Sequence, residues 1–421
     1  MSTSIPSDDR RVVLTGVGVV APTGLNAADW WKATLQGSSG IGPISRFDAS
    51  KYDTRLAGQV DGFEATDYIE QRLVVQTDRW TWMALAAAQM AFDDAAFDPT
   101  AYDPYSMSVI TASGSGGNEF GQKEIQNLWG KGPIYVGAYQ SIAWFYAATT
   151  GQIGIKHGMK GASGVVLAEG AGGLEAVAQA RRAIRRGVDT VVTGGLEAPI
   201  GPYALACQLR SGRLSSAEDP AEAYRPFDAR ANGYVPGEGG AIILAESVER
   251  ARERGAPQVY AEVLGYGATN DAYHYAKPAP DGRQFARAIS RALDDAGVGP
   301  EEIDVIFADA AALPEDDAIE VKALKDVFGQ RATEIPITAP KSMVGRLCAG
   351  GAALDVAAAL LAMRDGSIPP TVNLDQPADG NDLDFVTGEA RKAEVKTVLI
   401  NARGYGGFNG ALVLRRVDGA A

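Results

Sequence analysis

The stretch GVVLAEGAGGLEAVAQARRAIRRG, residues 164–187, contains a short apolar run, a turn of very small residues and a helical pattern. The apolar run predicts a strand, and the pattern from Leu174 predicts a helix that ends at Gly187. Turns of this kind often present a nucleophile at the junction of a strand and a helix. Gly170, at the tip of the turn, has no side chain. The stretch therefore indicates an α/β unit whose turn carries no reactive group.

The alternation of strands and helices continues on both sides of this unit. In the first part of the chain it predicts elements in segments 11–20, 26–37, 78–95, 106–112, 189–195 and 239–247. Near residue 256 the pattern restarts, with further elements in segments 258–271, 282–298, 303–311, 318–329, 352–366 and 395–416. We expect Asn26 to cap the first helix and Gly37 to follow its end. The absence of a Pro/Ser linker predicts two α/β halves, residues 10–255 and 256–416, packed as one body.

Composition limits the classes of partner and of cellular compartment. The formal charge of −13 argues against a nucleic-acid or anionic-membrane surface as the main partner. Two cysteines without CxxC spacing argue against a zinc or disulfide framework, and they fit a reducing cytoplasm. The start of the sequence, MSTSIPSDDRR, has no apolar segment typical of a signal peptide. The apolar run 350–363 is short and contains Asp355, so it predicts a buried helix and no membrane span.

Each candidate for independent chemistry has a simpler structural explanation. Residues 16–21, GVGVVA, match a dinucleotide fingerprint only loosely, because Pro22 follows where the helix should begin. Small neighbours predict packed, inert cysteines at 207 and 348, and the two histidines, at 157 and 274, are expected in surface loops. The acidic cluster fits a helix start favoured by the helix dipole, and consists of Asp309, Glu315, Asp316, Asp317 and Glu320.

Four segments together resemble the ketosynthase family of the thiolase fold, over about residues 10–416. They are RPFDARANGYVPGEGGAIIL (225–244), ADAAALPEDDAIE (308–320), PKSMVGRLCAGGAALD (340–355) and RGYGGFNGALVL (403–414). The resemblance implies an α/β fold of two pseudo-symmetric halves stacked as five layers, α-β-α-β-α. Active members carry a cysteine on the elbow between strand and helix, and two histidines that assist condensation.

The three catalytic positions of the family are all replaced in this sequence. The cysteine position is Gly170, the first histidine position is Asp309, and the second, five residues after Lys341, is Arg346. Lys341 and Glu320 are retained. Condensation needs a nucleophile to hold the acyl chain and donors that stabilise the enolate, and an ionised Asp309 would repel that enolate. We therefore expect no condensation on this chain and predict no catalytic residue, metal site or bound cofactor.

This set of losses resembles the chain-length factors, or ketosynthase-beta subunits, of bacterial type II aromatic polyketide synthases. The resemblance implies a heterodimer with a catalytic ketosynthase (alpha) subunit, which elongates a poly-β-keto chain on an acyl carrier protein. The phosphopantetheine arm of the carrier would act at the partner subunit. The growing chain would enter a tunnel at the subunit interface, to which this chain contributes walls and an end. The subgroup usually has Gln at the elbow, so Gly170 is a departure that removes an amide proposed to help priming.

The same resemblance identifies candidates for the tunnel wall. The segment TASGSGGNEFG (111–121) matches the lining of the tunnel, and its Gly114, Ser115 and Asn118 predict a roomy cavity and a long product. Tyr135 and Leu205 are further wall candidates. Product length, starter unit and final metabolite do not follow from the sequence.

Two other functions stay open from the residues alone. One is an enzyme in its own right, either a malonyl decarboxylase using Glu169, Asp309 or Lys341, or a condensing enzyme with Cys348 as a displaced nucleophile. The other is a homodimeric acyl-binding scaffold. Four basic residues lie near the end of the helix predicted from Leu174 to Gly187: Arg181, Arg182, Arg185 and Arg186. They could dock the acidic carrier protein, although cations at this end of a helix also offset its dipole.

Overall fold

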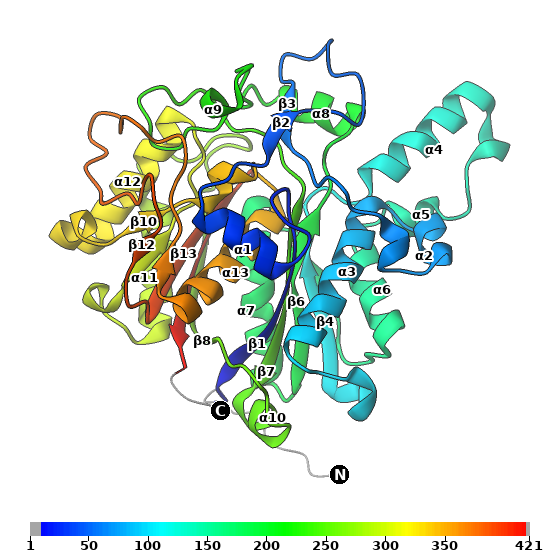
Figure 1. Cartoon of the computed structure of the whole chain (residues 1–421), viewed down its shortest axis with the longest axis horizontal. Helices are drawn as coiled ribbons and strands as arrows, with labels where there is room; N and C mark the ends of the chain where they lie inside the picture. Colours follow the sequence, from blue (N-terminus) through cyan, green and yellow to red (C-terminus); the bar gives the residue numbers. More distant parts are fainter. Residues whose placement is uncertain (1–9, 418–421) are drawn as a thin grey trace.

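The computed structural model describes residues 10–417, and the strands of the main sheet form two halves with one pattern (Figure 1). The first half runs in the order β5 (Gly164–Val166), β4 (Met107–Ala112), β6 (Thr190–Glu197), β7 (Gly239–Ser247) and β1 (Val12–Val20). The second runs in the order β10 (Ile337–Thr338), β9 (Val305–Phe307), β13 (Thr397–Gly404), β14 (Phe408–Arg416) and β8 (Ala261–Asn270). The residues behind the signal-peptide prediction lie outside the described range, apart from Arg10 and Arg11.

Strand direction is the same at matching places of the two halves. In each half the first three strands are parallel, and the last two pair antiparallel with their neighbours. The halves are joined through a short pairing of β1 with β8, in which Val13 faces Glu262 and Leu14 faces Ala261. The predicted pseudo-symmetric α/β architecture is confirmed, whereas the boundary between residues 255 and 256 stays a prediction.

Helices cover both outer faces and fill the space between the half-sheets. On the first half, α3 (Arg79–Asp94) and α6 (Ala148–His157) pack outside, and on the second half α11 (Arg283–Ala296) packs outside with α12 (Pro314–Phe328) against it. The middle layer contains α7 (Gly172–Arg185) and α13 (Ala349–Asp365). Nearly every side chain of α13 is buried, as expected for a helix between two sheets. The five layers of the expected α-β-α-β-α fold are therefore present.

The remaining elements are short. Six of the helices have four to nine residues: α1 (Ala27–Leu35), α2 (Gln71–Gln76), α5 (Gln140–Ala143), α8 (Pro202–Leu209), α9 (Pro220–Ala223) and α10 (Val248–Glu253). Two small sheets pair β2 (Ile41–Pro43) with β3 (Leu56–Gly58) and β11 (Ser367–Ile368) with β12 (Arg391–Lys392). The expected caps of α1 are confirmed, because the Asn26 side chain accepts from the Asp29 amide at 2.9 Å and Gly37 has φ +67°.

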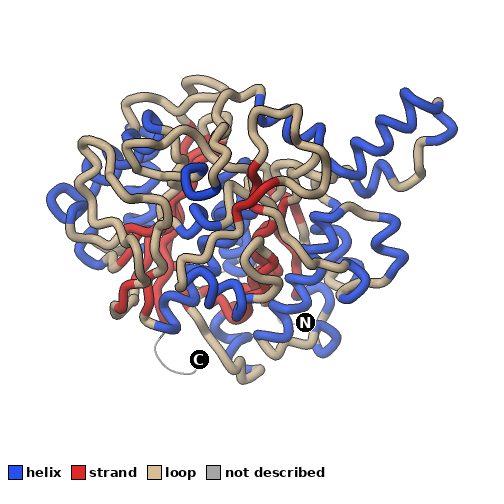
Figure 2. The backbone as a smooth tube through the Cα atoms, turned by 45° about the horizontal axis from the view of Figure 1, so that its top comes forward, coloured by secondary structure: helices blue, strands red, loops and turns tan. Residues whose placement is uncertain are grey.

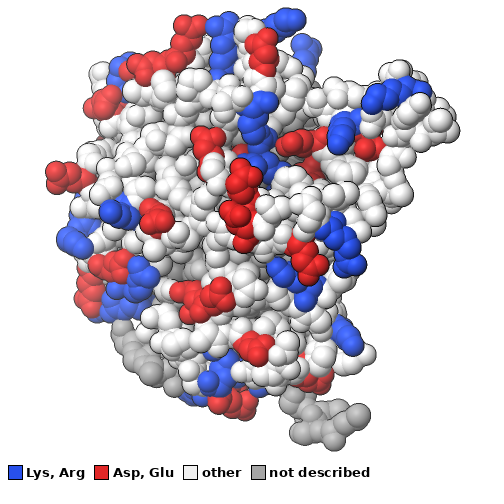
Figure 3. All heavy atoms as spheres, turned by 45° about the vertical axis from the view of Figure 1, so that its right-hand side comes forward, with Lys and Arg blue, Asp and Glu red and all other residues white. Residues whose placement is uncertain are grey.

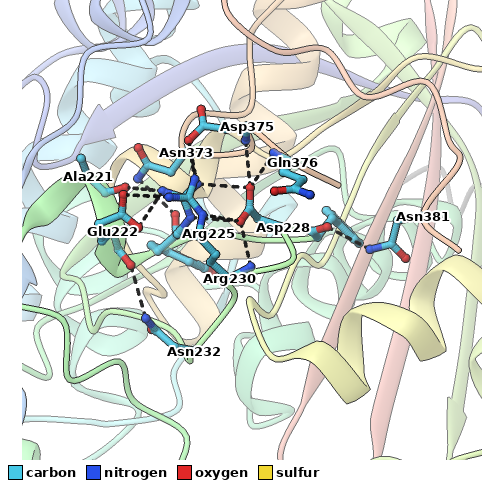
Figure 4. A network of polar contacts seen from close by, with 12 residues as sticks. Ala221, Glu222, Arg225, Asp228, Arg230, Asn232, Asn373, Asp375, Gln376 and Asn381 are labelled. Atoms are coloured by element: carbon cyan, nitrogen blue, oxygen red, sulfur yellow. Dashed lines mark hydrogen bonds and ion pairs between the residues drawn. The ribbon is translucent and has the colours of Figure 1, made fainter. Parts of the chain in front are cut away.

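The segment that begins RPFD fixes the loop 224–232 to a loop of the second half (Figure 4). Arg225 and Asp228 are buried and hydrogen-bonded to each other at 3.2 Å, and Arg225 also reaches Asp375 at 2.7 Å. Asp228 accepts from the Asp375 and Gln376 amides at 2.9 and 2.8 Å. Burial raises the pKa of Asp228, but hydrogen bonds from Arg225 and these amides lower it well below its usual range. This network holds the polypeptide that passes above the carboxyl ends of the strands.

Residues 118–145 form an arm, in which α4 (Asn118–Lys131) and the turn Pro133–Tyr135 stand off the body and α5 lies at the root (Figures 1 and 2). Its root packs tightly, because a Cβ on Gly117 would clash with the backbone oxygen of Ala143. Its outer part exposes large apolar side chains, of which Trp129 and Ile134 are 83% and 87% exposed. None of the helices within residues 10–417 is long and apolar enough to cross a membrane.

Candidate functional site: a closed centre beside a small-residue loop

The elbow between β5 and α7 is closed over Gly170. The chain passes through a single helical turn, Glu169–Ala171, before α7 begins at Gly172. A Cβ placed on Gly170 would clash with the backbone oxygen of Arg403 and lie 3.1 Å from Nη2 of Arg346. Glu169 has φ +46°, so the residue before the tip carries the backbone strain of the turn. The elbow is therefore filled from the opposite strand, which leaves no room for a side chain at its tip.

Asp309 and Arg346, the two replaced histidine positions, lie together with Arg403 at the end of β13. The Asp309 carboxylate accepts from the backbone amide of Arg403 at 2.8 Å and from its Nε at 3.0 Å. Nη2 of Arg346 donates to the backbone oxygen of Arg403 at 2.7 Å and lies 3.6 Å from Asp309. Burial raises the pKa of Asp309, but the guanidinium groups of Arg346 and Arg403 outweigh burial and lower it to about 2. Asp309 is therefore ionised and charge-compensated.

The two retained residues, Glu320 and Lys341, hold this centre in place. Glu320 accepts from the backbone amides of Asp309 and Ala310 at 2.8 and 2.9 Å. Lys341 donates to the backbone oxygen of Ala308 at 2.7 Å and pairs with Asp355 at 2.6 Å. The cationic and anionic side chains of the centre thus neutralise one another, and none is left to act as a free general base.

Cys348 is unsuited to nucleophilic attack. It directly precedes α13 and has φ +47°, and burial together with the carboxylates of Glu169 and Glu197 raises the pKa of its thiol well above the usual range. A thiol that stays protonated at neutral pH is a poor nucleophile. Its predicted inertness agrees with this environment, whereas Cys207 is exposed on α8, contrary to the prediction of a packed thiol.

Two small hollows lie at the centre. One is lined by Gly170, Cys348 and Lys341 among others, and the other by Tyr234, Tyr405 and Arg403 among others. Arg346 and Asp309 line both. The guanidinium of Arg346 also lies 5.8 Å from the centre of the Tyr234 ring, a cation–π contact that holds it in place.

The candidate tunnel segment lies directly beside the elbow. Gly114 is exposed at the end of β4, and a Cβ built there would have ordinary contacts with Glu197 Oε1 at 3.4 Å, Glu169 Cα at 3.6 Å and Cys348 Cβ at 3.7 Å. Ser115 follows, and Asn118 begins α4 and donates to the Ser115 backbone oxygen at 3.0 Å. The sequence-predicted trio thus forms one loop next to the closed centre.

The two weaker wall candidates lie elsewhere. Tyr135 is 54% exposed in the turn after α4, and Leu205 is 1% exposed in α8, packed with Ile44, Ala57 and Ile200. Their predicted contact with a growing chain stays a prediction, as it does for the loop trio.

Several sequence expectations for charged or titratable side chains need correction. Arg181 is buried, pairs with Asp295 and donates to the Leu264 backbone oxygen, so it joins α7 to the second half and cannot dock a carrier. His157 ends α6 instead of lying in a loop, and burial lowers its pKa to about 4. His274 is exposed in a loop as expected. Within residues 10–417, no group of three or more His, Cys, Asp or Glu side chains is placed to hold a metal ion.

Sequence reasoning missed Arg403 and Glu197. Arg403 is 6% exposed and Glu197 0%, and each follows an apolar run, in VLINARGYGG and VVTGGLEAP respectively. A charge at such a position must be paired or hydrogen-bonded, and this signal could have identified both residues.

Comparisons with known proteins agree with this geometry. Residues 9–250 match the N-terminal domain of beta-ketoacyl synthases, and residues 260–375 match the C-terminal domain. The chain therefore belongs to the beta-ketoacyl synthase family. It is 53% identical to the tetracenomycin polyketide synthase ketoacyl synthase beta subunit of Streptomyces glaucescens, over 96% of this chain and 98% of the relative. The predicted resemblance to ketosynthase-beta subunits is thus confirmed.

Solved structures extend the comparison to a ketosynthase pair and to a carrier complex. The ishigamide ketosynthase/chain length factor matches with a TM-score of 0.90 and 33% identity, over 97% of this chain and 99% of that one. A type II polyketide synthase acyl-carrier protein in complex with its ketosynthase, bound to the hexaketide, matches with a TM-score of 0.88 and 30% identity, over 97% and 100%.

Proposed function

We propose that this chain is the non-catalytic, length-setting subunit of a heterodimeric synthase. Its catalytic ketosynthase partner elongates a poly-β-keto chain from malonyl units carried by an acyl carrier protein. The observation that carries the proposal is the closed centre, in which Arg403 and Arg346 fill the space over Gly170 and neutralise Asp309. Such a centre offers neither a nucleophile nor a free base. The fold and the similarity to ketosynthase-beta subunits support a subunit that pairs with a catalytic ketosynthase.

The free edge of the sheet supports pairing with a second subunit. Within residues 10–417, β5 lies at the end of the strand order and β4 is its single strand partner, so its other edge can offer backbone groups to a second chain. Leu167, directly after β5, is 53% exposed. An apolar side chain beside an open strand edge is a surface that a folded partner can cover.

The arm extends this surface. Its exposed apolar side chains are Ile125, Leu128, Trp129, Ile134, Tyr135, Tyr139, Ile142, Trp144 and Phe145. In the space-filling view of this side, the arm stands off the body and much of its surface is uncharged (Figure 3). A monomer seldom exposes so many large apolar groups in one segment, so the arm fits an interface. We assign both surfaces to the catalytic ketosynthase, since this chain lacks the chemistry that the partner must supply.

The loop trio is the proposed determinant of length. Gly114, Ser115 and Asn118 leave space beside the elbow, so a growing chain that enters between the subunits meets small side chains here. The phosphopantetheine arm of the carrier acts at the partner, where the acyl chain is attached, and this chain binds no cofactor. The two cysteines are free, which suits a cytoplasmic assembly.

Replacing Gly114 by Phe tests the length-setting role. Gly114 lacks a positive φ and a Cβ there meets only ordinary contacts, so the backbone accepts a larger residue that then occupies the proposed cavity. We expect products shorter by one or more extension units, determined by mass spectrometry of the polyketides released by the heterodimer. Asn118→Phe should act in the same direction. Unchanged product lengths from folded, active heterodimers would contradict the proposal.

A further inference from the structure

Glu197, at the end of β6, holds the start of the proposed length-setting loop. Its carboxylate is fully buried and accepts from the Gly114 amide, from the Ser115 amide at 3.2 Å and from Ser115 Oγ at 2.5 Å. Three donors from two neighbouring residues converge on one carboxylate, which is a strong, charge-assisted arrangement. The loop therefore leaves β4 in a direction that Glu197 determines.

Asp78 holds the other end of the loop. It caps α3, where one oxygen accepts from the Trp80 amide at 3.3 Å, and its second oxygen accepts from the Phe120 amide at 2.7 Å. Asp78 is 2% exposed. One buried carboxylate thus fastens the first turn of α4 to the beginning of α3, a helix of the body.

Apolar side chains do not fix the loop. In the described part of the chain, no side chain of residues 113–120 belongs to a hydrophobic core cluster, and Gly114 to Asn118 are all small or polar. Backbone hydrogen bonds anchor it at two points, from the Ser113 amide to the Val166 oxygen at 3.1 Å and from the Gly117 amide to the Trp144 oxygen at 3.2 Å. The carboxylates of Glu197 and Asp78 add the side-chain acceptors that cross to β6 and α3, and Glu197 binds the residues between these two points.

Both carboxylates are costly to bury, which indicates that they do more than fill space. Burial raises the pKa of Glu197 to about 7, although Ser115 and the Gly114 amide favour its charged form, and burial raises the pKa of Asp78 to about 7 as well. An apolar residue at either site would avoid the desolvation of a charge but would leave the loop amides without acceptors.

We propose that Glu197 and Asp78 are positioning residues that set product length, by fixing the loop 113–120 at a defined distance from the elbow. The proposal rests on the length-setting function proposed above. Neither residue contacts the growing chain. Each acts through the loop 113–120, which contacts the growing chain. A change at either site therefore alters the depth of the cavity and how firmly its wall is held, without adding bulk to it.

The test replaces each carboxylate by its amide in the heterodimer. Glu197→Gln and Asp78→Asn keep the shape but turn one acceptor into an N–H donor that faces the loop amides. Losing a hydrogen bond to a buried charged group shifts a conformational population on the order of tenfold. We expect the share of products that depart from the main length to rise by about that factor. Ser115→Ala removes one donor only and should produce a smaller shift, even if the other variants fold poorly.

Asp317→Asn is the matched control. Asp317 is 1% exposed and accepts from the Phe227 and Ala312 amides at 2.8 and 3.1 Å, and neither amide belongs to the loop 113–120. It should lower the melting temperature to a similar extent and leave the length distribution unchanged. If Asp317→Asn broadens the distribution as much as Glu197→Gln does, the effect is general loosening and the proposal is overturned.

Gly114→Phe separates the two proposals. If it shortens the products while folded Glu197→Gln and Ser115→Ala keep the parental distribution, the positioning role is wrong and the length-setting function stands. If Gly114→Phe also leaves product lengths unchanged, the length-setting function itself fails. If all of these variants alter product length and the control does not, both proposals are supported.

Discussion

At the scale of single residues, the most informative position is Gly170. The sequence raised the question of why an elbow has no nucleophile, and the structure gives a steric answer, since the backbone oxygen of Arg403 and the guanidinium of Arg346 occupy the space. Loss of the cysteine and the replacement of the second histidine position by Arg346 therefore belong together. A side chain cannot be restored at the tip without moving the end of β13.

Gly170→Ala and Gly170→Gln test this steric account. Overpacking a closed site costs about 1–3 kcal/mol, so Gly170→Ala should lower the melting temperature of the heterodimer, and Gly170→Gln should lower it further. Because the added amide has no room to face an acyl group, we expect no rise in priming rate. A stable Gly170→Gln heterodimer that primes markedly faster would show that the elbow opens and that the amide matters.

Arg346 is the second residue whose role can be isolated. It lines the same small hollow as Cys348, so it should shield Cys348 from small reagents. We expect a small thiosulfonate to label this chain once, at exposed Cys207, and twice in an Arg346→Ala variant, as read by intact mass. Arg346→Met fills similar space without charge and should remain singly labelled. Double labelling of the parent would show that Arg346 does not close the centre.

At the scale of elements, the loop that carries Arg225 and Asp228 connects the two halves above the ends of the strands. Its ion pair is buried on both sides, unlike the outer contact with Asp375, whose side chain is 69% exposed. Breaking a buried pair leaves an uncompensated charge and costs about 3–5 kcal/mol, whereas an exposed pair contributes about 0–1 kcal/mol. The burial of the pair, more than its number of contacts, should therefore determine how much it contributes to the free energy of unfolding.

Asp228→Asn and Asp375→Asn form a matched pair of variants. We expect Asp228→Asn to destabilise the chain strongly, as a large drop in melting temperature or a loss of soluble heterodimer. Asp375→Asn should change the melting temperature little. Thermal unfolding of both variants at pH 7 gives the comparison. Equal effects would mean that the network works as a surface cluster and not as a buried clamp.

The elements themselves were largely predictable from sequence, because most signals are local. Alternating apolar runs, the Asn26 cap and the glycine-rich turns marked strands, helices and their ends. The apolar segment 395–416 was likewise predicted to contain regular elements, and it forms β13 and β14. What sequence could not give is the pairing of Arg403 with Asp309, 94 positions apart, or of Glu197 with Ser115, because such contacts depend on how distant elements meet.

At the scale of the whole molecule, the fold has a closed side and an open side. The centre between the half-sheets is closed by compensated charges, while the edge strand β5 and the arm expose backbone groups and apolar side chains. The family fold was thus recognisable from sequence, but the projection of the arm was not, since its apolar side chains do not follow a core pattern. This asymmetry fits a division of labour in which the partner reacts and this chain shapes the space for the product.

The most direct measurement of that division is the intact mass of each subunit, after the purified heterodimer is incubated with malonyl-loaded and acetyl-loaded carrier protein. The account predicts a covalent acyl adduct on the catalytic ketosynthase and none on this chain, because Gly170 cannot be acylated and burial and nearby carboxylates raise the pKa of the Cys348 thiol, which keeps it protonated. An acyl adduct on this chain, mapped to Cys348 or to any other residue, would contradict it.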